Sequence, residues 1–319
     1  MMKGEVIKLN YKKIDGASVS SVILGTDYYG STVSKNDCFK LYDMYVENGG
    51  NHIDTAHLYV GGESERILGE WLKGKSRDGL YIATKGAHPP LDNMNASRLT
   101  RTDIRADLEE SLKNLSLDYV DLYWLHRDNP VADIEEVMET LNELIKEGKI
   151  RSIGCSNWTG ERIKQANEYA KNHGLKGFCA SQIKWSLART SPSYADDPTL
   201  VEMNASEFEF YKESQIPVIA FASQGKGFFS KVYNSGVDSL SDKAKDRYLC
   251  EDNLRRYEAV KTLAQKYNTS VGAIAVAWIA SQTDVCAMPI IGCKNKAQLA
   301  DSLKSADLVL TQEEIEFCM

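Results

Sequence analysis

The feature that most constrains the fold is a repeated alternation of short apolar runs, rich in β-branched residues, with longer segments of helical periodicity. This rhythm predicts β-α-β units, because a short run that is apolar throughout is typical of a parallel strand buried on both faces. The predicted strands are residues 21–26, 51–55, 80–85, 119–125, 150–155, 177–183, 217–222 and 286–291.

Helices are predicted in the intervals between these strands. The clearest stripe lies in residues 133–147, where apolar residues recur along one helical face and Gly148 supplies a stop signal. The predicted helices are residues 35–48, 64–72, 102–115, 134–147, 160–172, 207–214, 254–267, 271–282 and 296–305.

Eight buried strands joined by helices favour a closed (β/α)8 barrel, the TIM barrel, over an open sheet. We expect residues 1–319 to form a single barrel domain, in which residues 1–20 form an N-terminal β-hairpin that closes the bottom of the barrel. A turn is expected at Asp15-Gly16. Long irregular segments are expected after three strands, over the C-terminal face, at residues 86–101, 184–206 and 224–252.

Composition limits the class of protein. The chain is 43% hydrophobic and carries a net charge of −7, with its basic residues scattered, so neither nucleic acid nor a membrane surface is expected as a partner. The N-terminal stretch lacks the apolar run of a signal peptide, and the seven cysteines contain no Cys-x-x-Cys pair. We expect a soluble cytoplasmic protein with reduced thiols and no metal site, and the oligomeric state stays open.

Polar residues recur at the C-terminal ends of the predicted strands. Asp54, Lys85 and His126 end or follow successive strands, which brings a carboxylate, an ammonium and an imidazole to one end of the barrel. Burial of an unpaired charge is costly, so these groups are expected to interact. A purely structural Asp54–Lys85 salt bridge, with His126 as a capping residue, is the alternative for each residue taken alone.

The set also has the chemistry of a proton-transfer device. A tyrosine phenol has a pKa of about 10 and is a weak acid at neutral pH. A nearby lysine ammonium, held by an aspartate, would lower the pKa of Tyr59, and a neutral histidine could hydrogen-bond the same reacting oxygen.

The run GGNHIDTAHLYVGGESERILG, residues 49–69, resembles the signature of the aldo-keto reductase family. Its matching positions are Asp54, Ala56, Tyr59, Ser64, Glu65 and Gly69. Further similar motifs follow in order along the chain: IATKG, DLYWLHRDNP, GKIRSIGCSNW, SQIKWS and IIGCKNKAQL. The resemblance therefore covers essentially the whole chain.

The resemblance implies a catalytic tetrad of Asp54, Tyr59, Lys85 and His126. In that family the tyrosine protonates a carbonyl oxygen while hydride arrives from a nicotinamide, so Tyr59 would be the proton donor. Lys85 and Asp54 would tune it, and His126 would orient the substrate oxygen. An aldehyde or a ketone, possibly derived from a sugar, would be the substrate, with NADPH (NADP+) as the cofactor.

No Gly-x-Gly-x-x-Gly follows the first strand, so a Rossmann dinucleotide site is disfavoured. A glycine-containing loop at 223–227 could approach a pyrophosphate closely, and a helix start beside Lys294 is a natural phosphate receptor. By resemblance, Lys294 meets the adenosine 2′-phosphate and Phe221 stacks on the nicotinamide. The expected cofactor contacts are Thr26, Asp54, Ser156, Asn157, Gln182, Phe221, Ser223, Gln224, Gly225, Gly227, Lys294, Asn295, Gln298 and Ser302.

Aromatic residues near the strand ends are candidates for the wall of a substrate pocket: Tyr28, Trp124 and Trp185. The two tryptophans could instead pack within the barrel. Two other functions remain open at this point. One is a lyase that forms a Schiff base through Lys85, and the other is a nicotinamide-binding regulatory subunit with weak turnover.

Overall fold

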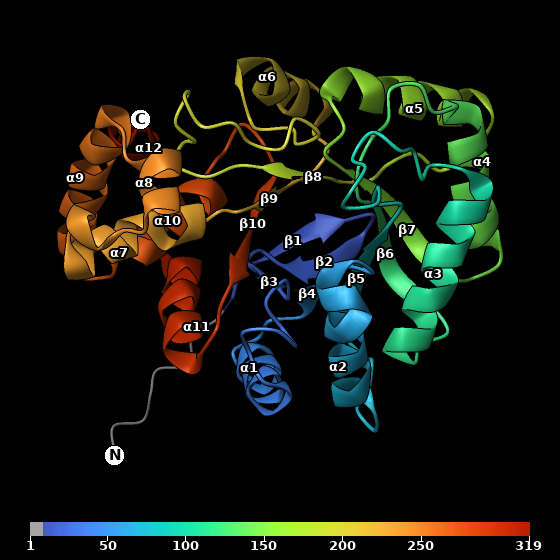
Figure 1. Cartoon of the computed structure of the whole chain (residues 1–319), viewed down its shortest axis with the longest axis horizontal. Helices are drawn as coiled ribbons and strands as arrows, with labels where there is room; N and C mark the ends of the chain where they lie inside the picture. The colour runs from blue at the N-terminus through green and yellow to red at the C-terminus, as the bar shows by residue number, and fades with distance from the viewer. Residues whose placement is uncertain (1–8) are drawn as a thin grey trace.

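The structure, a computed structural model that describes residues 9–319, contains a closed barrel of eight parallel strands, which confirms the predicted (β/α)8 architecture. The strands follow one another around the barrel in chain order, with β10 closing against β3 (Figure 1). They are β3 (Ile23–Gly25), β4 (His52–Asp54), β5 (Tyr81–Gly86), β6 (Val120–Leu125), β7 (Ile150–Ser156), β8 (Ser181–Lys184), β9 (Val218–Phe221) and β10 (Ala287–Gly292).

Each predicted helix is present, with ends shifted by a few residues. Ser34, Thr100 and Thr159 cap three of them, because each side chain accepts a hydrogen bond from the backbone N–H three residues later. The helices are α1 (Lys35–Glu47), α2 (Glu63–Leu72), α3 (Arg101–Leu115), α4 (Ile134–Lys146), α5 (Gly160–Asn172), α6 (Ala205–Ser214), α9 (Glu251–Lys266), α10 (Val271–Ala280) and α11 (Lys296–Leu303). Among residues 9–319, no helix is long and apolar enough to cross a membrane.

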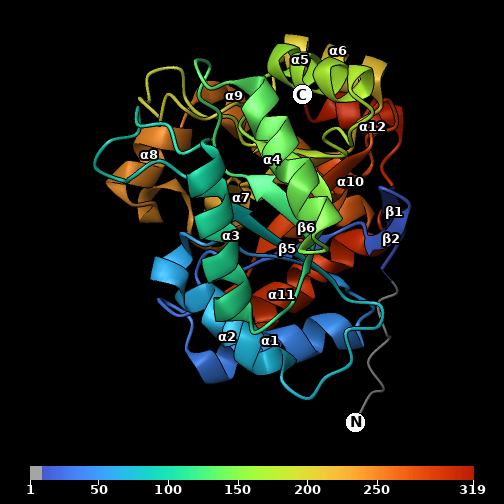
Figure 2. The same ribbon diagram turned by 90° about the vertical axis from the view of Figure 1, so that its right-hand side faces the viewer.

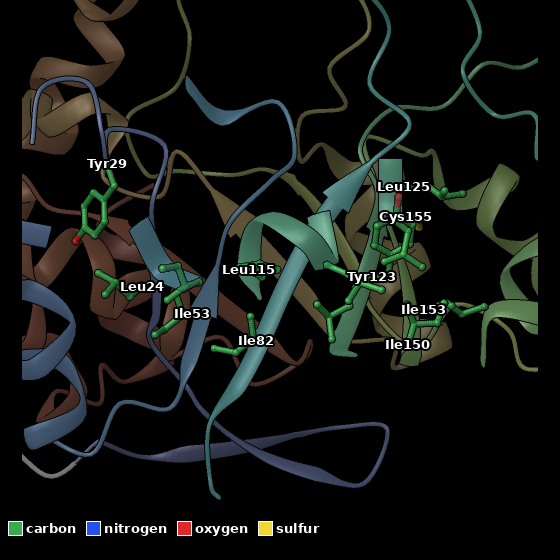
Figure 3. Close-up of a cluster of buried hydrophobic side chains, with 14 of the residues drawn as sticks. Leu24, Tyr29, Ile53, Ile82, Leu115, Tyr123, Leu125, Ile150, Ile153 and Cys155 are labelled. Carbon is green, nitrogen blue, oxygen red and sulfur yellow. The ribbon is translucent and has the colours of Figure 1, made fainter. Parts of the chain in front are cut away.

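The main hydrophobic layer lies between the strands and the surrounding helices. Leu24, Ile53 and Ile82, from β3, β4 and β5, belong to one buried cluster with Leu115 of α3 (Figure 3). Alternate residues of the strands point the other way, into the barrel. The strands are buried on both faces, as their uniform apolar character predicts.

The barrel interior is closed at its N-terminal end by a hairpin of β1 (Tyr11–Ile14) and β2 (Ala17–Ser20). Its turn at Asp15-Gly16 is confirmed, with φ angles of 45° and 81°. Ile14 and Val19 are fully buried in the interior cluster with Ile23. The hairpin prediction is therefore confirmed from residue 11 to residue 20, and residues 1–8 lie outside the described part of the chain.

The hairpin is also tied to the barrel by polar contacts. Lys12 donates hydrogen bonds to the carbonyl oxygens of Ala280, at 3.2 Å, and Ala287, at 2.7 Å. Figure 2 shows the hairpin and α8 (Asp242–Tyr248) at opposite sides of the molecule. The end of the barrel that the hairpin seals is therefore the one away from the long loops.

Two predictions about local structure were wrong. Residues 224–252 are not irregular, since they contain η2 (Gly225–Gly227), α7 (Phe228–Ser235), η3 (Val237–Ser239) and α8. These helices are short, and only Tyr248 of α8 is buried, so no long apolar stripe marks them. Strand β8 begins at Ser181, four residues later than predicted. The structure also adds η4 (Lys304–Asp307) and α12 (Gln312–Phe317) at the end of the chain.

We expect Ile14→Ala to lower the free energy of unfolding by about 3 kcal/mol, because it leaves a cavity where the hairpin fills the barrel interior. Urea unfolding followed by circular dichroism measures the change. Val131→Ala, at a site that is 89% exposed, is the control and should leave stability unchanged. Equal, small effects of both variants would show that the hairpin does not contribute to the core.

Candidate active site

The C-terminal ends of β4, β5 and β6 bring three polar side chains together. Asp54 is the last residue of β4 and pairs with Ala83 of β5, so Lys85 extends just beyond it. His126 follows β6, and its backbone N–H donates to the Gly86 carbonyl at 2.8 Å. The parallel register thus places a carboxylate, an ammonium and an imidazole on neighbouring strands.

Lys85 is fully buried and donates to three oxygens. Its Nζ binds the Asp54 carboxylate, the Thr55 carbonyl at 2.8 Å and the Tyr59 hydroxyl at 3.2 Å. Burial disfavours the charged ammonium, but the Asp54 carboxylate and Tyr59 outweigh it and raise the pKa of Lys85. Lys85 is therefore a cation at neutral pH.

Tyr59 reaches Lys85 from a tight turn rather than from a strand. It opens η1 (Tyr59–Gly62), in which Val60 and Gly61 adopt left-handed φ angles of 52° and 60° before α2 begins. The residue is partly exposed, but its hydroxyl end is surrounded by other groups, and this burial raises the pKa of Tyr59 although Lys85 opposes the shift. This departs from the expected lowering of the Tyr59 pKa, because desolvation of the phenolate exceeds the attraction of the ammonium.

His126 lies beside Tyr59. Their ring centroids are 5.9 Å apart and the rings meet edge to face. Burial and the nearby Lys85 ammonium hold the pKa of His126 well below its usual range, so the imidazole is neutral. Within residues 9–319, its buried Nδ1 has no hydrogen-bond partner. The structure therefore brings all of the expected tetrad together, with a protonated phenol and a neutral imidazole at its open side.

The amide and hydroxyl groups on β7 and β8 lie next to this cluster. Gln182 donates through Nε2 to the second carboxylate oxygen of Asp54, at 3.0 Å. Asn157, at a left-handed φ of 59°, donates to the Ser156 hydroxyl at 3.0 Å. Thr26 donates to the Asp54 carbonyl at 3.2 Å. These side chains are all buried, so their positions are fixed.

Two lysines converge on Tyr28 after strand β3. Lys294 lies 4.4 Å from the centroid of the Tyr28 ring, and Lys226 lies 5.5 Å from it. Lys226 also donates to the Tyr28 hydroxyl at 3.2 Å and lies 3.9 Å from the Asp27 carboxylate. Tyr28 was expected in the wall of a substrate pocket. Its ring instead contacts two lysine ammonium groups, whose positive charge suits a phosphate.

The start of α11 lies next to Lys294. Asn295 caps the helix by accepting from the Gln298 N–H at 2.9 Å, and the Gln298 side chain accepts from the Lys294 N–H at 2.8 Å. All three side chains are exposed. This helix N-terminus, with a lysine beside it, can bind an anion.

The loop after β9 is held by hydrogen bonds to β10 and α11. Ser223 donates to the Ile290 carbonyl at 2.5 Å, and Gln224 accepts from the Gly292 N–H at 3.0 Å. Gln224 also donates to the Ser302 hydroxyl at 2.9 Å. Ser302 is buried behind Gln224, so its expected contact with a cofactor is not supported by its position.

The remaining cofactor candidates lie in the same segment. Phe221 is half-buried at the end of β9. Gly225 and Gly227 have left-handed φ angles of 53° and 77°, with Lys226 between them. A side chain at Gly225 would meet the Ala188 methyl group at 2.7 Å, so this position requires glycine.

The two tryptophans depart from the expected substrate wall. Trp185 packs against Trp278 of α10, at a centroid distance of 5.9 Å, and against Phe208 of α6 at 6.3 Å. Successive side chains of a strand point to opposite faces, and the buried Gln182 and Lys184 share one face. Trp185 therefore lies on the other face, which points outward from the barrel. Trp124 is fully buried in the interior cluster with Leu122 and Met288. Both residues are core positions.

Three polar residues near the site were missed from the sequence. Lys226 lies within the glycine-containing loop at 223–227, and Arg127 directly follows His126. Arg127 donates to the Thr199 hydroxyl at 3.0 Å and pairs with Asp197 at 3.4 Å, which holds the loop after β8. His88 lies against His126 with ring centroids 4.7 Å apart. The sequence signal that could have identified His88 is its position three residues after Lys85.

Comparison with known proteins gives a consistent result. The sequence pattern of the Aldo/keto reductase family matches residues 21–318. Norsolorinic acid reductase stcV of Emericella nidulans is 31% identical, with 94% of this chain and 77% of that protein aligned. The probable aryl-alcohol dehydrogenase AAD4 of Saccharomyces cerevisiae is 27% identical, with 90% and 88% aligned. The crystal structure of the thermostable aldo-keto reductase Tm1743 has a similar fold, with a TM-score of 0.73, 24% identity and coverage of 97% and 98%.

We expect Asp54→Asn to lower the free energy of unfolding by about 3 kcal/mol, because it leaves the buried Lys85 ammonium without its carboxylate. The double variant Asp54→Asn/Lys85→Met removes both charges, so its free energy of unfolding should fall less than that of the single variant. Urea titrations at pH 7 compare the two. A double variant less stable than the single one would show that the ion pair is not what sustains the buried charge.

Proposed function

The chain belongs to the aldo/keto reductase family, and on this basis we propose that it reduces an aldehyde or a ketone to the alcohol with NADPH, using Tyr59 as the proton donor. One observation supports this most directly. The Tyr59 hydroxyl lies 3.2 Å from the Nζ of a buried Lys85 that is bound to Asp54. Burial of the hydroxyl keeps the phenol protonated, and the Lys85 cation lies beside it, where it can stabilise the phenolate.

The proton chemistry follows from these charges. Tyr59 stays protonated at neutral pH and gives its proton to the carbonyl oxygen. The Lys85 ammonium then stabilises the phenolate, and Asp54 keeps the ammonium charged. Neutral His126 donates a hydrogen bond to the same oxygen and orients the carbonyl. When bound, NADPH would supply the hydride for the carbonyl carbon, and with the proton from Tyr59 this would complete the alcohol.

The residues around the strand ends fit a nicotinamide dinucleotide. Two lysines on the Tyr28 ring and the N-terminus of α11 offer positive charge for phosphates. The adjacent Gln182 uses Nε2 to bind Asp54, which leaves Oε1 to accept from a carboxamide. The buried Ser156 and Asn157 offer further polar groups to the same amide.

The alternative of a Schiff-base lyase is less consistent with the charges. A lysine attacks a carbonyl only as the neutral amine, and catalytic lysines of that kind have lowered pKa values. Here the pKa of Lys85 is raised by Asp54 and Tyr59 despite burial. No feature of residues 9–319 favours a regulatory subunit over an enzyme.

The activity is tested by mixing the protein with NADPH and a panel of carbonyls and following absorbance at 340 nm. The panel should contain an aryl aldehyde, an aliphatic aldehyde and several ketones, since the relatives are named for norsolorinic acid and for aryl alcohols. Carbonyl-dependent NADPH oxidation supports the proposal. Tight NADPH binding without oxidation by any carbonyl would support the regulatory alternative.

We expect Tyr59→Phe to reduce kcat by about a hundredfold or more, because the ring remains while the donated proton is lost. The Kd for NADPH, measured by fluorescence titration, should not change. Tyr233→Phe is the control, since Tyr233 is 58% exposed on α7. Full turnover of Tyr59→Phe would remove Tyr59 from the acid role.

We expect Lys294→Ala to raise the Kd for NADPH about tenfold and to change the Kd for NADH little, because only NADPH carries a 2′-phosphate for this lysine. Lys304→Ala removes an exposed lysine charge at the other end of α11 and should alter neither constant. Equal weakening of both cofactors by Lys294→Ala would contradict a 2′-phosphate contact.

A further inference from the structure

A second imidazole lies against the imidazole of His126. The ring of His88 meets the His126 ring nearly at right angles, with centroids 4.7 Å apart. His88 is only partly buried, whereas His126 is 7% exposed. The proton-transfer chemistry proposed above uses Tyr59 and His126 and gives His88 no role.

The backbone holds His88 in this position. The residue before it, Ala87, has a left-handed φ of 59°, which is uncommon for a residue with a side chain. The Ala87 N–H donates at 2.8 Å to Asp107, whose carboxylate is also bound by Arg98. Strained backbone of this kind persists only where its surroundings hold it, and it concentrates at functional sites.

The tautomer of His88 follows from its neighbour. Its Nδ1 lies 2.6 Å from the carbonyl oxygen of Pro89, and a carbonyl only accepts, so the proton is on Nδ1. Burial, reinforced by the charge of Arg127, lowers the pKa of His88, so the ring is neutral at pH 7. The Nε2 atom therefore carries a lone pair. Among residues 9–319, no group donates a hydrogen bond to it.

We propose that His88 selects the substrate by accepting, through Nε2, a hydrogen bond from a hydroxyl of the carbonyl compound. The substrate class is then a hydroxy-aldehyde or hydroxy-ketone, with the hydroxyl on the carbon next to the carbonyl or on the following one. This inference rests on the proposed reductase function, in which His126 holds the carbonyl oxygen. The His88 and His126 ring centroids are 4.7 Å apart, so a substrate whose carbonyl oxygen is held by His126 lies beside His88.

A matched trio of ketones separates donation by the hydroxyl from its mere size. Hydroxyacetone has a hydroxyl that donates, methoxyacetone keeps the oxygen but cannot donate, and butanone has a methyl group instead. We expect wild-type kcat/KM with NADPH to be about tenfold higher for hydroxyacetone than for either of the others, which corresponds to one hydrogen bond.

Variants at His88 test the assignment. His88→Ala should abolish the preference, so that the ratio of kcat/KM for hydroxyacetone to kcat/KM for butanone falls about tenfold, to near one. His88→Gln, whose side-chain oxygen can accept, should restore part of the preference. His173→Gln, at an exposed histidine of α5's C-terminal end, is the control and should change nothing.

The outcomes separate this inference from the function on which it rests. Equal kcat/KM for all three ketones in the wild type, or a preference that survives His88→Ala, would overturn the role of His88 and leave the reductase intact. Absence of turnover with this trio and with the whole carbonyl panel would overturn the reductase function, and the selection of substrate by His88 with it.

Discussion

The rest of the site depends on the charge of one buried lysine. Lys85 is fully enclosed by the barrel, and an ammonium there is tolerated only with a carboxylate and further oxygens in contact. Asp54 supplies the charge, and Gln182 from the opposite side of the barrel holds Asp54 in turn. The polar groups of several strands thus form one hydrogen-bonded unit, and Tyr59 is attached to it from a loop. None of these residues can be understood singly.

Much of this unit could be predicted from the sequence. Eight apolar runs gave the barrel, and parallel strands align their C-terminal ends, so Asp54, Lys85 and His126 had to lie close together. The bottom hairpin could be predicted because Asp15-Gly16 is a strong turn signal. These inferences depend on local sequence patterns and on one topological rule, the common direction of the barrel strands. They require no knowledge of individual side-chain contacts.

Other features depend on quantities that the sequence does not contain. The direction of the Tyr59 pKa is set by the balance between desolvation and the Lys85 charge, and only the packing determines which is larger. The sequence allows Trp185 to line a substrate pocket or to pack in the core, and the alternation that continues past β8 turns it outward against α10. The proposed role of His88 depends on the left-handed backbone at Ala87, which the sequence does not predict. Such details are set by register and tertiary contacts.

The sealed N-terminal end of the barrel has a consequence for how this protein can evolve. Ile14, Val19 and their neighbours anchor the barrel at the end away from the chemistry, so stability and selectivity are carried by different residues. Substitutions in the loops after β5, β8 and β9 can therefore be sampled without weakening the hairpin end. A scaffold of this kind can acquire new carbonyl preferences by small steps while the hydrogen-bonded unit around Lys85 stays unchanged.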